Sequence, residues 1–287
     1  MTGVELMIQV LTCSALVGLL GAVGLRLTYA EVKRSLAQSR FLPIVLLNFV
    51  AVPALAVLAV IGFRLGGEVA TGMILLAAAP FAPVVPVFAR MARAELALAA
   101  ALTGIFPLLA AVLTPVAARV ALWSLKRSAA IQFDMWTSLA ILVATISLPL
   151  AVGVFLRHRA PQLARRLLKP VEVLSEAMGA ASLAFVTVTQ FGLITDLGWR
   201  AWLAMGLVSE ISLALGWQFG GPRRGSRQVV AFGTSNRNIA LALLVAIQSF
   251  HGTKVASVVV GNGLLLIGLG LLHVAWWRFR RKEGRLA

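Results

Sequence analysis

Long apolar segments run through almost the whole chain, and they restrict its possible folds more than any other feature of the sequence. The 287 residues are 60% hydrophobic and 13% charged, whereas a soluble domain carries about 25% charged residues. An apolar run of about 20 residues is long enough to cross a bilayer as a helix. Nine such runs are predicted, at residues 4–25, 41–62, 69–89, 96–118, 135–156, 174–195, 200–219, 228–249 and 255–277.

These runs predict an all-α integral membrane protein with a single transmembrane domain over residues 1–287. The first run has no basic residue before Arg26. A secretory signal needs a basic beginning, so this run is expected to be a retained span. The basic segment 157–173 is expected to form an amphipathic helix lying on the membrane surface.

The basic residues predict the orientation. With the N-terminus outside, 19 of the 26 Lys and Arg residues fall on one side, six fall on the other, and Arg237 remains inside a span. Because cytoplasmic loops are enriched in Lys and Arg, we expect a multi-pass protein of the cell membrane with an extracytoplasmic N-terminus and a cytoplasmic C-terminus. The net charge of +16 is assigned to these loops and to anionic lipid, and no nucleic-acid partner is expected.

Two parts of the chain share a layout. Residues 77–118 and 231–275 each hold a broken span, a polar turn and a span rich in small residues. Prolines break the first span, and the run Gly233–Asn238 breaks the second. The charge count makes the two broken spans antiparallel, which predicts inverted half-repeats at 4–118 and 174–277 with an unpaired span at 135–156. Such paired breaks indicate the midplane site of a transporter; the alternative is two merely kinked helices in another kind of membrane protein.

Arg237 lies about halfway across the eighth run, where an arginine costs about 2.5–3.5 kcal/mol on insertion scales. It therefore needs a partner or water. Glu210, midway through the run at 200–219, is the only carboxylate expected at that depth. The pair could be a structural tether. Alternatively, Arg237 binds an anionic substrate while Glu210 orients it or titrates, which leaves proton coupling possible. Ser235 and Asn236 are predicted to cap a half-helix whose N-terminus favours anions.

Three motifs then indicate a family. Asn238 to Ala242 is similar to the N-x-x-L-A motif of the bile acid:sodium symporter family, and GLRLTYAEVKRSL at 24–36 resembles the first conserved loop of that family. The segment AAAPFAPVVPVFARMARAELALAAAL resembles its first broken helix and the turn after it. The chain is identified as a divergent member. The resemblance implies panel and core domains, two discontinuous helices that cross near the middle of the membrane, and loss of the first span of the first repeat.

The sequence departs from that family where sodium is bound. The family's glutamate and glutamine positions in the second broken helix hold Gly233 and Arg237 here. Counting back from Glu95 places Val85 and Pro86 on the expected Ser-Asn pair. On the following span, one expected hydroxyl is lost, and Thr103 is in position to keep another. The resemblance therefore implies transport without the usual sodium ligands.

The remaining polar residues add little chemistry. Asn48, Gln190 and Asn262 lie inside spans and are predicted to make helix–helix hydrogen bonds or to line the cavity. No catalytic or nucleotide-binding motif is present, so no enzyme activity, metal site or cofactor is expected.

The predicted function is secondary transport of a small organic anion by alternating access, without sodium coupling. An arsenite, metabolite or drug efflux carrier is an alternative, although the only cysteine, Cys13, is in the first span. A non-transporting membrane sensor on the same fold is another. The candidate substrate-binding residues are Gly233, Thr234, Ser235, Asn236, Arg237, Asn238, Glu210, Pro83, Pro86 and Thr103.

Overall fold

The computed structural model describes residues 3–28, 33, 40–125, 135–250 and 252–283. Within these residues the chain is helical and contains no strand. The conserved-loop resemblance at 24–36 lies mostly outside them. The helices are α1 (Gly3–Arg26), α3 (Phe41–Leu46), the π-helix η1 (Leu47–Ala51), α4 (Val52–Gly62), α5 (Gly67–Ala77), α6 (Val85–Met91), α7 (Leu96–Ser124), α8 (Met135–Leu142), the π-helix η3 (Val143–Ser147), α9 (Leu148–Arg159), α10 (Pro161–Thr189), α11 (Phe191–Thr195), α12 (Trp199–Phe219), α13 (Arg224–Ser235), α14 (Ile239–Ser249) and α15 (Val255–Glu283).

Seven stretches of the described chain are long and apolar enough to cross a membrane. Two of the nine predicted runs are not among them. One is the run at 69–89, because its helical part α5 ends after 11 residues at Ala77. The other is the run at 200–219, which does form the 21-residue helix α12 but carries Arg200, Glu210 and Gln218. A count of nine spans and a division into panel and core domains therefore stay predictions.

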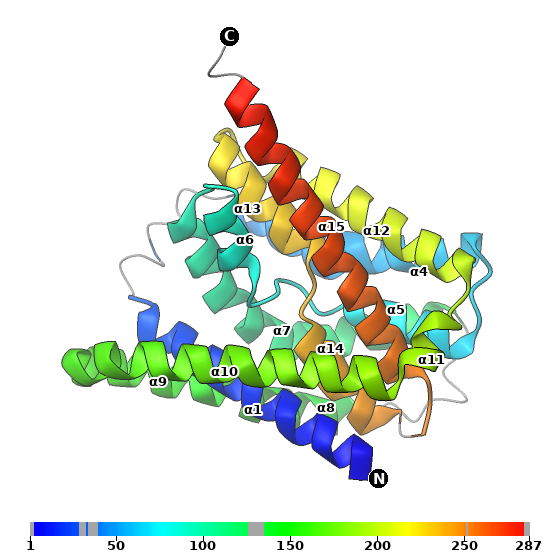
Figure 1. Cartoon of the computed structure of the whole chain (residues 1–287), viewed down its shortest axis with the longest axis horizontal. Coiled ribbons are helices and arrows are strands. Elements are labelled where there is room, and N and C mark those ends of the chain that lie inside the picture. The colour runs from blue at the N-terminus through cyan, green and yellow to red at the C-terminus, as the bar shows by residue number, and fades with distance from the viewer. Residues whose placement is uncertain (1–2, 29–32, 34–39, 126–134, 251, 284–287) are drawn as a thin grey trace.

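The helices lie in two layers in Figure 1. Helix α1 packs along α9 and α10 on one side of the molecule. Small residues allow the closest approach: an added Cβ at Gly24 of α1 would lie 2.4 Å from the carbonyl oxygen of Leu150 in α9. The helices α6, α12 and α13 lie on the other side, and α15 runs from that side down to α10 and α11. Two non-helical segments cross between them, at 78–84 and at 236–238.

The basic segment 157–173 does not form a separate surface helix. Helix α9 ends at Arg159, and α10 begins at Pro161 and continues without a break to Thr189. At 1.5 Å per residue its 29 residues extend roughly 43 Å. The predicted surface helix was wrong because Pro161, at the first helical position, starts the helix that continues into the span.

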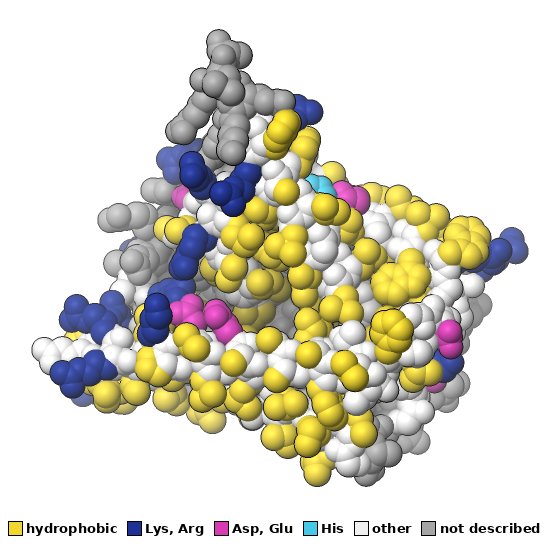
Figure 2. All heavy atoms as spheres, in the orientation of Figure 1, with side chains coloured by type: hydrophobic (Ala, Val, Ile, Leu, Met, Phe, Trp, Pro, Cys, Tyr) yellow, Lys and Arg dark blue, Asp and Glu magenta, His cyan; other side chains and the backbone are white. Residues whose placement is uncertain are grey.

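Charge is distributed unevenly over the surface. In Figure 2 most of the Lys and Arg atoms on the visible face gather at one side, near the end of α15 and the start of α10, and few lie at the opposite side. Apolar side chains cover much of the surface between them. Cytoplasmic surfaces of membrane proteins are enriched in Lys and Arg, and the orientation of this chain stays a prediction.

Candidate functional site

The two broken helices cross and are hydrogen-bonded to each other at the crossing. The backbone N–H of Ala82 donates to the carbonyl of Asn236 at 3.1 Å, and the N–H of Asn238 donates to the carbonyl of Ala79 at 2.7 Å. The hydroxyl of Thr114, on α7, donates to the carbonyl of Ala78 at 2.7 Å. Breaking a helix leaves backbone groups without partners, and here each break supplies partners for the other. The predicted crossing beside Pro83 is confirmed.

Arg237 lies inside this crossing with 4% of its surface exposed. Its Nη1 donates to the side-chain oxygen of Asn48 at 2.7 Å and to the carbonyl of Thr234 at 3.2 Å. Its Nη2 donates to the backbone carbonyl of Asn48 at 2.9 Å and to the carbonyl of Ala77. All four acceptors are neutral oxygens. They satisfy the terminal N–H groups of the guanidinium group, but none of them carries a negative charge that would offset its positive charge.

The local helix geometry explains why the backbone carbonyl of Asn48 is available to Arg237. Asn48 lies in the π-helix η1, where the N–H of Val52 bonds to the carbonyl of Leu47 instead of that of Asn48. The next residue along, Pro53, has no N–H to donate. The carbonyl of Asn48 is therefore left without a partner inside its own helix, and Arg237 takes it. Short π-helices within α-helices are often found at functional sites.

The other two carbonyls belong to helix ends. Ala77 is the last residue of α5, and Thr234 is in the last turn of α13. The C-terminus of a helix carries partial negative charge and free carbonyls. Broken transporter helices use such C-terminal ends and unwound carbonyls to coordinate Na⁺ or H⁺. The guanidinium group of Arg237 therefore occupies a setting that suits a bound cation.

The predicted Arg237–Glu210 pair was wrong. The Oε2 atom of Glu210 lies 3.3 Å from Nε2 of His273 on α15, and 43% of the Glu210 side chain is exposed. Ser209 and Ser212 are the buried residues on this part of α12. Neighbouring residues of a helix point about 100° apart, so Glu210 faces away from the core. The tether interpretation rested on this pair and is wrong with it: Arg237 is held by oxygens of Asn48, Ala77 and Thr234 instead of a carboxylate.

The predicted position of the second break was also partly wrong. The unwinding predicted at 233–237 is observed at Asn236–Asn238, and Gly233, Thr234 and Ser235 belong to α13. The N-cap of α14 is Asn238, whose side chain accepts from the N–H of Leu241 at 3.1 Å, rather than Ser235 or Asn236.

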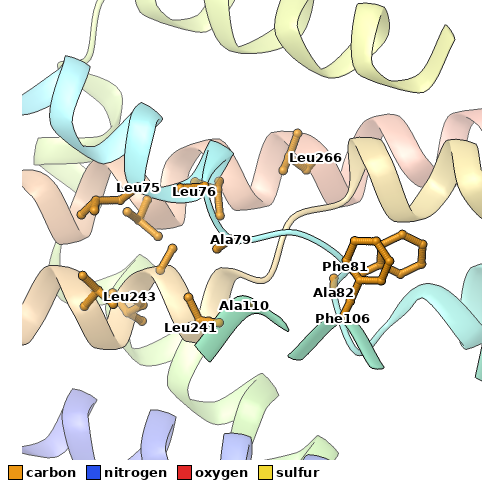
Figure 3. Packing of buried hydrophobic residues seen from close by; sticks show 14 of the residues in the cluster. Leu75, Leu76, Ala79, Phe81, Ala82, Phe106, Ala110, Leu241, Leu243 and Leu266 are labelled. Carbon is orange, nitrogen blue, oxygen red and sulfur yellow. The ribbon is translucent and has the colours of Figure 1, made fainter. Parts of the chain in front are cut away.

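Gly233 lies in α13 at a position where a larger side chain does not fit. A Cβ built there would lie 2.0 Å from the ring of Phe81. Phe81 itself is fully buried in the first break, has a positive φ of 56°, and packs against Phe106 with ring centroids 4.3 Å apart. Figure 3 shows these two rings together beside Ala82. Gly233 thus serves close packing.

A cavity of about 370 Å³ lies between this crossing and the layer of α1 and α10. Figure 2 shows a hollow along α10, with acidic side chains at its edge. Most of its lining is apolar, for example Leu19, Val87 and Leu243. Its polar side chains are Thr12, Glu176, Ser182, Asn236, Arg237 and Asn238. Cys13 does not line it.

Three side-chain atoms at the second break have no hydrogen-bond partner among the described residues: Oδ1 of Asn236, Nε of Arg237 and Nδ2 of Asn238. All three residues are at least nine-tenths buried. An unpaired buried polar atom costs about 1–3 kcal/mol, so three such atoms in consecutive residues make the second break a costly part of the fold.

The other predicted residues are spread more widely. Pro83 lines the 370 Å³ cavity, and Pro86 lines an adjoining cavity of about 80 Å³. Ser235 lines a pocket of about 20 Å³ that also touches Arg237 and Asn262. The buried hydroxyl of Thr103 has no partner in the described part of the chain. Thr103, Thr234, Gly233 and Glu210 line none of these cavities.

Sequence reasoning missed several residues of the site. Asn48 was predicted to make helix–helix hydrogen bonds, which it does, but its role as the main partner of Arg237 was not foreseen. The available signal was a polar residue inside an apolar run, five positions before Pro53. Glu176, Thr12 and Ser182 were missed because their segments were assigned to ordinary spans.

Comparison with known proteins identifies a family. A family model described as the sodium bile acid symporter family matches residues 8–197. The matched region includes the first break and ends before α12, so Arg237 lies outside it. Among curated proteins, none matches the chain.

Proposed function

We propose a transport function, starting from the fact that this chain belongs to the sodium bile acid symporter family. Its helices and its family make it a multi-pass membrane transporter. The finer proposal is secondary transport of a small organic anion by alternating access, without sodium coupling, in the cell membrane with the N-terminus outside. Four features support this proposal. They are the carbonyl oxygens that Arg237 occupies, the 370 Å³ cavity, the unpaired N–H groups at the second break, and the uneven distribution of Lys and Arg over the surface.

The position of the Arg237 guanidinium group is the main support for transport without sodium coupling. This group already donates hydrogen bonds to the carbonyl oxygens of Asn48, Ala77 and Thr234. Like charges about 4 Å apart repel by about 4 kcal/mol even at an effective dielectric of 20. A sodium ion would have to compete with a covalently attached cation for the same oxygens, so Arg237 replaces the ion permanently.

The anion preference rests on the same break. The four terminal N–H bonds of Arg237 are committed to oxygens, so a substrate cannot use them in a two-pronged contact. What remains is Nε–H of Arg237, the amide of Asn238 and the N-terminal end of the 11-residue helix α14. These donors and the positive charge favour a carboxylate or sulfonate, and the apolar walls favour a hydrophobic body.

Flux in proteoliposomes tests the proposal. Purified protein is reconstituted, and uptake of labelled octanoate and taurocholate is measured with Na⁺, K⁺ or choline at constant ionic strength. We expect saturable uptake of at least one anion with the same half-saturation in all three media. Uptake that rises steeply with Na⁺ overturns the sodium-free proposal. Saturable binding with no flux would instead favour the membrane sensor.

A further inference from the structure

Two charged residues of opposite sign line the 370 Å³ cavity. Arg237 belongs to the break between α13 and α14, and Glu176 belongs to α10. Every other described residue that lines the cavity is neutral. The two charges therefore belong to different elements. The guanidinium group of Arg237 bonds to Asn48, Thr234 and Ala77, none of which lines this cavity, so its charge acts from behind the second break.

Glu176 is not committed to another residue. The acid one turn earlier, Glu172, bonds to Nη2 of Arg26 at 2.6 Å. Across the described residues, Glu176 has no ion pair, and its side chain is exposed. Residues 172, 176, 179 and 183 follow the spacing of one helix face, and the last three of them line the cavity. The carboxylate is thus placed on the cavity wall by the same helical stripe as Gly179 and Leu183.

A simple anion does not complement such a cavity. Its charge would be attracted by Arg237 and the N-terminus of α14 but repelled by the carboxylate of Glu176. Like-charge contacts in a binding site act against the wrong partner. A solute with an ammonium group at its other end would satisfy both charges, and its apolar middle would fill the space between them.

We propose that the transported solute is a zwitterion with an apolar body, whose acidic group binds at Asn236–Asn238 and whose cationic group binds Glu176. This inference rests on the proposed transport function and narrows its substrate class. Thr12 and Ser182 also line the cavity, and their hydroxyl groups bond to each other at 2.7 Å.

A competing role for Glu176 is a gate. Glu176 also lines the 80 Å³ cavity together with Arg26, Glu172 and Arg90. Arg90 is on α6, across from α10. If Glu176 paired with Arg90 when the mouth closes, its removal would slow transport of every solute by a similar factor. A zwitterion site instead predicts an effect only on solutes with a cationic group.

Matched probes separate these roles. The ω-amino acids with 4, 6, 8 and 11 carbons are compared with the plain carboxylates of equal length, by calorimetric binding to purified protein and by uptake into proteoliposomes. The wild type, Glu176→Gln and the matched control Glu172→Gln are measured. Glutamine keeps the size of the side chain and removes only its charge.

We expect the wild type to bind one length of amino acid at least tenfold more tightly than its carboxylate. In Glu176→Gln this ratio should fall to about one, partly because the plain carboxylate binds better, and in Glu172→Gln it should persist. Tighter binding of carboxylates by the wild type overturns the zwitterion proposal but leaves anion transport standing. An equal loss for all probes in Glu176→Gln also overturns it, in favour of the gate. If the wild type binds and carries none of the probes, the proposed function fails first.

Discussion

The two broken helices meet at one point and exchange backbone hydrogen bonds, but only the second carries a charge. The first break, residues 78–84, carries no charged side chain and offers backbone carbonyls, including that of Ala79. The second break, residues 236–238, carries donors: the N–H of Asn238 and the guanidinium group of Arg237. Oxygens of Asn48 and Ala77 in the first half of the chain and of Thr234 in the second half hold this cation.

This difference explains how an arginine is tolerated at that depth. An isolated charge in a membrane is costly, and it is normally paired or exposed to water. Arg237 has neither a carboxylate nor solvent, but it has four oxygens, three of which are backbone carbonyls. Two of those carbonyls, from Ala77 and Thr234, lie at helix C-termini that carry partial negative charge. The breaks create the site that the arginine fills.

Removal of Arg237 is the strongest way to test this view. Arg237→Ala leaves the carbonyls of Asn48 and Ala77 buried without donors, and each unsatisfied group costs about 1–3 kcal/mol. We expect a loss of about 3 kcal/mol or more in stability, measured by thermal unfolding in detergent. Because the vacated oxygens suit a cation, Na⁺ should raise the melting temperature of the variant relative to choline.

The control is Arg227→Ala, which removes an arginine bonded to Gly221 at 2.8 Å near the start of α13. It should cost much less and should show no sodium effect. The cation-replacement view fails if Arg237→Ala unfolds at the wild-type temperature. If Na⁺ and choline act alike on a destabilised variant, the carbonyls hold the arginine but do not form a cation site.

The sequence predicted the breaks better than it predicted their partners. Prolines at 80, 83 and 86 and the polar run after Gly233 are strong local signals, because each removes or competes for backbone hydrogen bonds. The spans followed from apolar run length in the same way. The signals do not report how a helix is rotated about its axis. Glu210 and Ser209 are neighbours in sequence, but only Ser209 is buried.

The missed contacts depend on tertiary geometry. Asn48 meets Arg237 across 189 positions of sequence, and no local pattern predicts which polar residue of a distant span reaches a given arginine. Gly233 suggested a flexible break, whereas the ring of Phe81 makes a glycine necessary inside α13. A glycine that permits close packing and one that permits unwinding look alike in a single sequence.

Gly233 tests whether the first break packs rigidly on the second helix. Gly233→Ala would place a Cβ 2.0 Å from the Phe81 ring, and overpacking of this kind costs about 1–3 kcal/mol. We expect a corresponding fall in thermal stability, relieved in the double variant with Phe81→Leu. Gly268→Ala is the control, since an added Cβ there meets nothing within 4 Å. An unchanged melting temperature for Gly233→Ala would mean that the crossing is loosely packed.

Two substitutions at Asn48 distinguish the effect of the Arg237 charge from the effect of its hydrogen bonds. Asn48→Asp places a carboxylate where the amide oxygen lies 2.7 Å from Nη1 of Arg237, and so cancels the positive charge beside the cavity. We expect anion affinity to fall about tenfold, or about 1.4 kcal/mol, in equilibrium binding. Asn48→Ala, which removes a contact but keeps the charge, should reduce stability with little change in affinity. Equal affinities in the two variants would show that the charge of Arg237 does not reach the substrate.

The smallest effect is expected at Glu210, on the helix that packs against the second broken one. Its carboxylate faces His273 and is 43% exposed, and partly exposed ion pairs contribute about 0–1 kcal/mol. Glu210→Gln should therefore change anion affinity and uptake less than about twofold at every pH, whereas Arg237→Ala changes the protein strongly. Flux measured from pH 5.5 to 8.5 checks this. A pH dependence of uptake that disappears in Glu210→Gln would mean that α12 turns during transport and brings Glu210 toward Arg237. The crossing would then hold its arginine by carbonyls in one state and by a carboxylate in another.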